Sequence, residues 1–425
     1  MSRWLTNIRG LKLSLLLIVS AIVIIAYVVA IRAITMPPVD LSQLVISTEL
    51  AQRLQAHVDY LASPELKGRK PGTPGNRAAA QYIQEAFHQA GLESLTSLGG
   101  YGQTISPTLG DNLIAVRRAR SPHSKERWLL VGAHYDHLGE SWGKIYAGAD
   151  DNASAVGILL ETARATEPLI HYSIAFVAFN AEEAPFIRTP LMGSQYFVDH
   201  LPVEIGSPGQ LQAVIIMDLM GGVHWEPLRD VVFAAGAEHS PGLYRHVKHL
   251  HEAQDDGQGL MVHPIGMHVI EEIPVLGQTP FSDYDAFRNA SVPYLFLSAG
   301  RTPRYHQPSD LPDTLHYERM ALTVRWIHDV LLNIDQDPHP YDFEPNRIEL
   351  ADEVATLRPL ITKAAAWDTS IPGTSPASLL RLKLDANWLA TLDPNHAGSD
   401  DITRLEHASL RLQCLLGDFS GCFLL

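Results

Sequence analysis

Near-continuous apolar runs alternate with amphipathic segments through the middle of this chain. The runs are four to seven residues long and occupy residues 112–116, 128–133, 173–179, 213–217 and 294–297. Such runs are typical of strands that are covered on both faces. Helical spacing of apolar residues predicts helices over residues 50–61, 75–90, 153–165, 194–200 and 314–334. Together these elements predict an α/β fold in which helices sandwich a mixed, mostly parallel central sheet.

The pattern changes character beyond residue 335. A proline-containing break at residues 337–340 is followed by three segments with helical spacing, around 347–364, 377–392 and 402–416. We therefore expect a main domain over residues 45–335 and a helical C-terminal extension over 340–425. The extension is either packed on the main domain or folded as a small subdomain.

The longest apolar stretch lies near the N-terminus, from Leu13 to Ile31, and three basic residues precede it. A helix of this length covers about 28 Å, close to the thickness of the hydrocarbon core of a membrane. Basic flanks stay in the cytoplasm. We expect residues 1–35 to form a cytoplasmic tip and a transmembrane anchor, with the rest of the chain periplasmic or otherwise extracytoplasmic. The alternative is a cleaved signal peptide and a secreted protein.

Composition narrows the classes of function. The formal net charge of −15 leaves no basic surface for nucleic acid, and we expect no nucleic-acid partner. The two cysteines, Cys414 and Cys422, are too few for a cysteine-based zinc site. They form either one bridge or two free thiols. Nothing in the composition indicates an oligomeric state.

Acidic residues and histidines stand where the predicted strands end, and the carboxyl edge of an α/β sheet is where ligands bind. His134 and Asp136 are two residues apart, so in an extended chain both side chains emerge on one face. This placement suits a metal-bound imidazole whose other nitrogen faces a carboxylate. A strand end with ordinary polar residues is the simpler interpretation of this segment alone.

Three further segments carry carboxylates beyond strands or before a helix: Asp150 and Asp151, Glu182 and Glu183, and Asp218. Singly, the first pair suits a helix cap and Asp218 suits a turn. Two adjacent glutamates leaving a buried strand are costly unless they are paired or bind a cation. With His134 and His306, the set favours a hydrolytic zinc site of histidines and carboxylates.

The order of these motifs resembles the family of two-zinc aminopeptidases that also includes glutamate carboxypeptidase II. The motifs are His-x-Asp, Asp-Asp-Asn-x-Ser, Ala-Glu-Glu, Met-Asp and Tyr-His, and the similarity spans about residues 50–335. The resemblance implies a peptide substrate, an exopeptidase fold and two Zn²⁺ per chain. It implies five metal ligands: His134, Asp151, Glu183, Asp218 and His306.

The same resemblance implies a role for each remaining site residue. Asp151 bridges the two zincs, Glu182 is the general base, Asp136 orients His134, and Tyr305 helps to hold the developing oxyanion. It also implies a cis peptide bond between Asp151 and Asn152. The sequence departs from the family at Tyr284, where the family commonly has a histidine, so the resemblance does not carry substrate contacts over to this position.

Two other functions remain open on the same motifs. Glutaminyl-peptide cyclotransferases resemble this family but keep a single zinc, and we expect tryptophan in them at the position of Tyr305. Receptor-like domains that resemble the family have lost metal ligands, whereas every ligand position here holds a competent residue.

Overall fold

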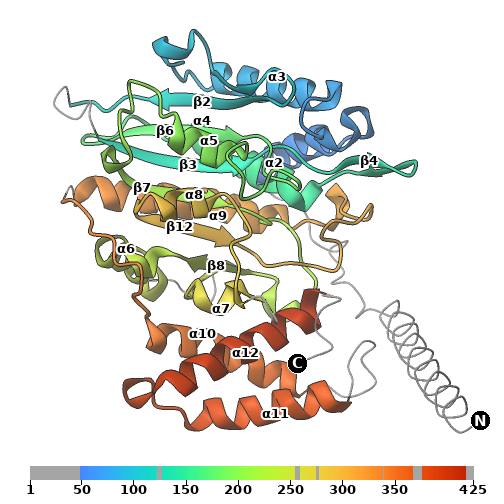
Figure 1. Cartoon of the computed structure of the whole chain (residues 1–425), viewed down its shortest axis with the longest axis vertical. Helices are drawn as coiled ribbons and strands as arrows, with labels where there is room; N and C mark the ends of the chain where they lie inside the picture. Colours follow the sequence, from blue (N-terminus) through green and yellow to red (C-terminus); the bar gives the residue numbers. More distant parts are fainter. Residues whose placement is uncertain are drawn as a thin grey trace, which may run out of the picture.

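An eight-stranded sheet forms the centre of the fold (Figure 1). Its strands lie in the order β1-β2-β6-β3-β7-β12-β8-β9. The computed structural model describes residues 48–121, 127–253, 259–273, 277–337, 339–366 and 376–417. The strands are β1 (Gly102–Ser106), β2 (Gly110–Arg117), β3 (Trp128–His134), β6 (Ser173–Phe179), β7 (Leu211–Met217), β8 (Val231–Ala235), β9 (Met261–Pro264) and β12 (Tyr294–Ser298). Two short hairpins join β4 (Gly139–Ser141) to β5 (Lys144–Tyr146) and β10 (Glu272–Ile273) to β11 (Gly277–Gln278).

The four central strands β6, β3, β7 and β12 run parallel, and so do β8 and β9. The other neighbours, β1 with β2, β2 with β6 and β12 with β8, are antiparallel. The predicted fold class, a mixed and mostly parallel sheet between helices, is confirmed. Because the central strands are parallel, their carboxyl ends meet at one edge of the sheet.

Each face of the sheet has its own apolar core, which explains the near-continuous apolar runs. Along β3, Leu129 and Val131 point into one core, while Trp128 and Leu130 point into the other. The first core lies under α2 (Glu49–Leu61), α3 (Pro74–Gln89), α4 (Ala155–Ala165), α6 (Pro241–Glu252) and α9 (Tyr317–Gln336). The second lies under α5 (Gly193–Asp199), α7 (His268–Glu271) and α8 (Tyr284–Asn289).

The C-terminal helices join the second of these cores. They are α10 (Leu350–Ala365), α11 (Pro376–Thr391) and α12 (Ser399–Gly417), and they lie beyond β8 at one end of the molecule (Figure 1). Leu357 of α10 and Leu412 of α12 are buried in the same cluster as Ala235 and Phe296 of the sheet. The extension thus packs directly on the main domain and closes one side of it.

Two features of the N- and C-terminal segments lie outside the described residues. The predicted transmembrane anchor, from Leu13 to Ile31, falls within residues 1–47, and Cys422 falls within 418–425. Among the helices that the structure describes, none is both long and apolar enough to cross a membrane.

Candidate metal centre

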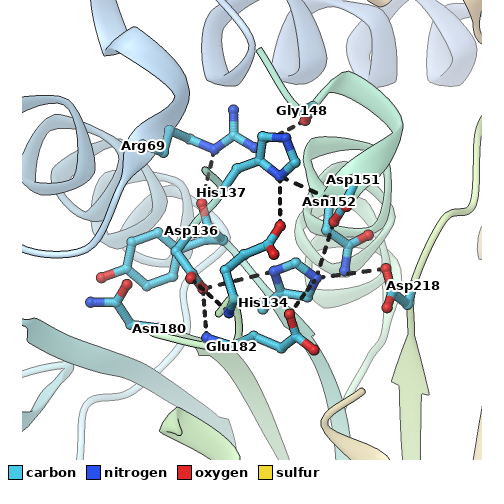
Figure 2. Close-up of polar contacts among 12 residues, drawn as sticks. Arg69, His134, Asp136, His137, Gly148, Asp151, Asn152, Asn180, Glu182 and Asp218 are labelled. Carbon is cyan, nitrogen blue, oxygen red and sulfur yellow. Dashed lines mark hydrogen bonds and ion pairs between the residues drawn. The ribbon is translucent and has the colours of Figure 1, made fainter. Parts of the chain in front are cut away.

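The predicted site residues converge at the carboxyl edge of the sheet, and Figure 2 shows His134, Asp136, Asp151, Glu182 and Asp218 among them. His134 is the last residue of β3, Asp218 directly follows β7, and Glu182 and Glu183 lie just beyond β6. Asp151 arrives from a wide helical turn, residues 149–154, that leads into α4. Parallel strands that end side by side therefore place residues that are far apart in sequence around one point.

One group of potential ligands surrounds His134. Its Nε2 atom lies 3.4 Å from Asp151 Oδ1 and 3.6 Å from Asp218 Oδ1. All three side chains are buried, and one donor atom from each lies within 4.8 Å of the others. This spacing leaves room for a cation between one imidazole and two carboxylates.

A second group shares Asp151 with the first. Its second oxygen, Oδ2, lies 3.2 Å from His306 Nε2, and the same nitrogen is 3.2 Å from Glu183 Oε2. His306 reaches this position from the loop that follows β12, with a positive φ of 56°. The five predicted ligands thus meet in two adjoining groups with Asp151 between them.

His137 is a member of the second group that the sequence analysis did not select. Its Nδ1 atom lies 2.8 Å from Glu183 Oε1 and 3.8 Å from Asp151 Oδ2, and its side chain is fully buried. His137, Asp151 and Glu183 bring one donor atom each within 4.8 Å of one another. The only signal in the sequence was its place three residues after His134.

These donor atoms approach one another without forming hydrogen bonds, which is what a metal site requires. Among the described residues, eight buried atoms of the centre have no hydrogen-bond partner: both ring nitrogens of His134 and of His137, Asp151 Oδ2, Glu183 Oε1, Asp218 Oδ1 and His306 Nε2. Each unpaired buried polar atom costs about 1–3 kcal/mol. Nitrogen and oxygen donors without sulfur fit zinc, so the residues present fit the metal that the sequence predicted.

A surrounding set of hydrogen bonds holds the donor groups in place. Asp136 accepts hydrogen bonds from the backbone N–H groups of Glu182 (3.1 Å) and Glu183 (3.2 Å). Its Oδ1 atom also lies 3.7 Å from His134 Nδ1, the nitrogen that faces away from the ligand group. Asp136 therefore fixes the start of the Glu pair and also faces the imidazole of His134.

The turn that carries Asp151 is held from two directions. Asp310 accepts hydrogen bonds from the backbone N–H groups of Asp150 (2.9 Å) and Asp151 (3.1 Å). Asn152 Nδ2 donates to the carbonyl oxygen of Met217, at the end of β7 (3.0 Å). The peptide bond between Asp151 and Asn152 is cis, and that prediction is confirmed.

Arg69 ties the loops around the centre together, and the sequence analysis did not select it. Its buried guanidinium donates to the carbonyl oxygens of Leu61, Tyr135, Ala147 and Gly148. Burial lowers the pKa of Arg69 to about 10, and the nearby carboxylates favour its charged form. The guanidinium therefore joins α2, the segment after β3 and the turn before α4, and adds one fixed positive charge behind the acidic centre.

Glu182 and Glu183 are neighbours in sequence but sit in opposite electrostatic settings. Burial, together with the carboxylates of Glu183 and Asp283, raises the pKa of Glu182 well above its usual value. Burial alone would also raise the pKa of Glu183, but His137 and His306 beside it hold its pKa below the usual range. The surroundings of the two residues therefore move their pKa values in opposite directions, up for Glu182 and down for Glu183.

Tyr305 and Tyr284 lie in different surroundings. The ring of Tyr305 stacks on His306 with 3.8 Å between the ring centroids, at the edge of the centre. Tyr284 is fully buried in the second core, and its hydroxyl donates to Glu271 (2.6 Å). The residue that replaces the family's histidine is therefore part of the core.

Comparison with known proteins agrees with this geometry. The model of peptidase family M28 matches residues 112–331. The uncharacterized protein YfbL of Escherichia coli (strain K12) is 27% identical over 307 residues, which cover 66% of this chain and 88% of that protein. The glutaminyl-peptide cyclotransferase of Boiga irregularis is 30% identical over 192 residues, 37% of this chain and 50% of that enzyme.

Solved structures with a similar fold include LapB from Legionella pneumophila, with a TM-score of 0.53 and 20% identity over 67% of this chain and 72% of that chain. The zinc aminopeptidase BSAP from Bacillus subtilis has a TM-score of 0.51 and 14% identity over 71% of this chain and 97% of its own. At such identities the similarity concerns the fold. The family match itself covers slightly more than half of the sequence, and it includes every predicted metal ligand. The chain belongs to peptidase family M28.

Proposed function

We propose that this protein is an aminopeptidase that uses two zinc ions to remove residues from the N-terminus of peptides. The observation that carries the proposal is the pair of ligand groups that share Asp151: His134 and Asp218 on one side, Glu183 and His306 on the other. A carboxylate with one oxygen toward each group is what a bridged pair of cations needs. When bound, zinc supplies a Lewis acid that polarises the scissile carbonyl and lowers the pKa of water.

Glu182 is the proposed general base. Its Oε2 atom lies 3.9 Å from His134 Nε2, so the carboxylate stands beside the ligand groups. A carboxylate in that place accepts a proton from the attacking water and delivers it to the leaving amine. Burial and the neighbouring carboxylates raise its pKa, and a higher pKa makes a carboxylate a stronger base.

Asp136 and Tyr305 complete the proposed machinery. Asp136 positions His134 and the backbone of the Glu pair through the contacts described above. Tyr305 covers His306 and lies where its hydroxyl can face an oxyanion that develops beside the second group. We assign it to holding that charge.

The second candidate is a glutaminyl-peptide cyclotransferase with one zinc. It is favoured by the 30% identity to the enzyme of that name from Boiga irregularis, which spans half of that enzyme. Against it stands the second ligand group, whose buried donor atoms would have no cation in a one-zinc enzyme.

A substrate panel with metal analysis separates the two candidates. We expect the purified protein to release the chromophore from aminoacyl chromogenic substrates, to lose this activity with a chelator, and to regain it with zinc. Elemental analysis should give two zincs per chain. Cyclisation of N-terminal glutaminyl peptides by a protein that holds one zinc would establish the alternative instead.

We further propose that the N-terminal segment anchors the enzyme in a membrane, with the catalytic domain on the extracytoplasmic side. The uncharged stretch from Leu13 to Ile31 with its basic flank supports this orientation. Protease added to intact spheroplasts should digest the domain, and the protein should sediment with membranes. A domain that resists protease until the cells are lysed would reverse the orientation, and release into the medium would indicate cleavage.

A further inference from the structure

An apolar cavity lies between the sheet and the C-terminal helices, next to the metal centre. Twelve of its seventeen lining residues are apolar and one, Arg301, is charged. The cavity volume is about 110 Å³, whereas a single buried water needs only about 10–15 Å³. The cavity can therefore hold a group much larger than one water, and its lining favours an apolar one.

Three residues at one end of this cavity adjoin the metal centre. Leu219 directly follows the ligand Asp218. Phe281 directly precedes Ser282, whose hydroxyl donates to Asp218 Oδ2 (2.9 Å). The guanidinium of Arg301 lies 4.7 Å from the centroid of the Tyr305 ring, which stacks on His306. A substrate held at the two ligand groups would thus have the cavity beside its reacting end.

The far wall of the cavity belongs to the C-terminal extension, beyond the part of the chain that matches the peptidase family. Leu357 and Leu360 of α10 line it, as do Ser409, Leu412, Gln413 and Leu416 of α12. Hydrogen bonds fix this wall to the main domain, because His268 of α7 bonds Glu353 of α10 and Glu406 of α12, at 2.9 Å each. Gln413 Nε2 also donates to the carbonyl oxygen of Val269 (3.1 Å).

We propose that this cavity is the specificity pocket of the enzyme, that α10 and α12 form its wall, and that it receives a large uncharged apolar side chain of the substrate's N-terminal residue. The inference rests on the proposed function. Leucine, methionine and phenylalanine side chains fit the lining. Lysine and arginine side chains do not, because none of the lining residues is a carboxylate that could pair with their charge.

Leu412 is the residue with which to test this proposal, and Leu405 is its control. Both are buried residues of α12, but only Leu412 lines the cavity. Leu412→Trp fills the cavity and should lower kcat/KM for leucyl and phenylalanyl substrates at least ~10-fold more than for alanyl substrates. Leu412→Ala enlarges the cavity and should shift preference from leucyl toward phenylalanyl substrates. Leu405→Ala should leave these ratios unchanged.

Zinc content and thermal melting of each variant, measured alongside, show that the metal centre and the fold are intact. Unaltered substrate ratios in both folded, zinc-loaded Leu412 variants overturn the pocket assignment. Wild-type protein that cleaves no aminoacyl substrate refutes the proposed function instead. In that case the pocket assignment can still be tested by measuring the binding of L-leucinamide by calorimetry. An affinity that Leu412→Trp lowers at least ~10-fold supports the pocket assignment. An affinity that neither Leu412 variant changes refutes it.

Discussion

Two clusters of histidines and carboxylates in this protein differ in their hydrogen bonds. In the first, the nitrogens of His134 and His137 lie near several carboxylate oxygens and hydrogen-bond none of them. In the second, both nitrogens of His268 form hydrogen bonds, one to Glu353 and one to Glu406. Both imidazole nitrogens of the second cluster therefore have partners within the protein, whereas the imidazole nitrogens of the first have none.

The difference shows how a ligand set can be told from an ion-pair cluster. In a salt-bridged cluster, each ring N–H points along the line to one oxygen, and the protonated ring is stabilised. Burial alone would lower the pKa of His268, but the two carboxylates raise it to about 9. In a ligand set, the lone pairs of the nitrogen and oxygen atoms point to a common centre. These atoms therefore lie close to one another, but their angles do not suit hydrogen bonds between them. Mutations should therefore change metal binding in one cluster and stability in the other.

The largest effect should come from the Glu pair of the first cluster. Glu182→Gln keeps the size of the side chain but cannot accept a proton, so turnover should fall at least ~10²-fold with zinc content unchanged. Glu183→Gln should lose zinc at one site, because that side chain belongs to a ligand group.

Steady-state kinetics and elemental analysis of both variants provide the test. A metal-depleted Glu182→Gln beside a fully loaded Glu183→Gln would mean that the two roles are exchanged. Full activity in both variants would remove the catalytic assignment altogether.

A smaller effect is expected at His137. Because its Nδ1 atom lies against Glu183 and near Asp151, His137→Ala should weaken zinc binding at one of the two sites by about 10–100-fold. Zinc titration by calorimetry measures this change. His268→Ala is the matched control from the second cluster and should leave both zinc affinities unchanged. Equal zinc affinities in His137→Ala and the wild type would place His137 outside the metal centre.

The second cluster should respond to pH through stability. The pKa of His268 is raised from 6.5 to about 9 in the folded protein, so its stabilisation is fully present below pH 6.5 and is lost as pH rises through about 9. A shift of this size corresponds to a free energy on the order of 3 kcal/mol.

Urea unfolding of the zinc-loaded wild type and of His268→Gln between pH 6 and pH 9.5 measures this contribution. The gap in unfolding free energy between the two proteins should close as pH rises. A gap that stays constant over this range would show that His268 is not held as a cation.

The residues that the sequence identified are those whose place follows from strand ends. His134, Glu183 and Asp218 follow near-continuous apolar runs, and parallel pairing brings the ends of those runs together without further information. His306 and Asp151 lie on irregular segments whose path no periodicity gives, so the residue pattern made them candidates and the resemblance selected them as ligands. The residue pattern could thus identify where the metal centre lies, but the family motifs were needed to identify all of its ligands.

What the sequence could not show depends on side-chain direction and on distant packing. His137 lies in an irregular segment after β3, where two-residue alternation no longer predicts which way a side chain points. The cavity has lining residues from Leu219 to Leu416, drawn from elements that meet only through tertiary packing. Strands β8 and β9 were not predicted either, although they support the extension.

The packing of α10 and α12 on the sheet has a practical consequence for anyone who expresses this protein in pieces. The family match ends at residue 331, and the break near residue 337 looks like a natural place to end a recombinant fragment. Such a fragment would keep every predicted metal ligand. It would also expose to solvent the apolar surface around Ala235 and Phe296 that the helices cover, and surfaces of this kind cause aggregation. Insolubility of such a fragment would result from the absence of the helices that cover the sheet, and it would give no information on the chemistry at the metal centre.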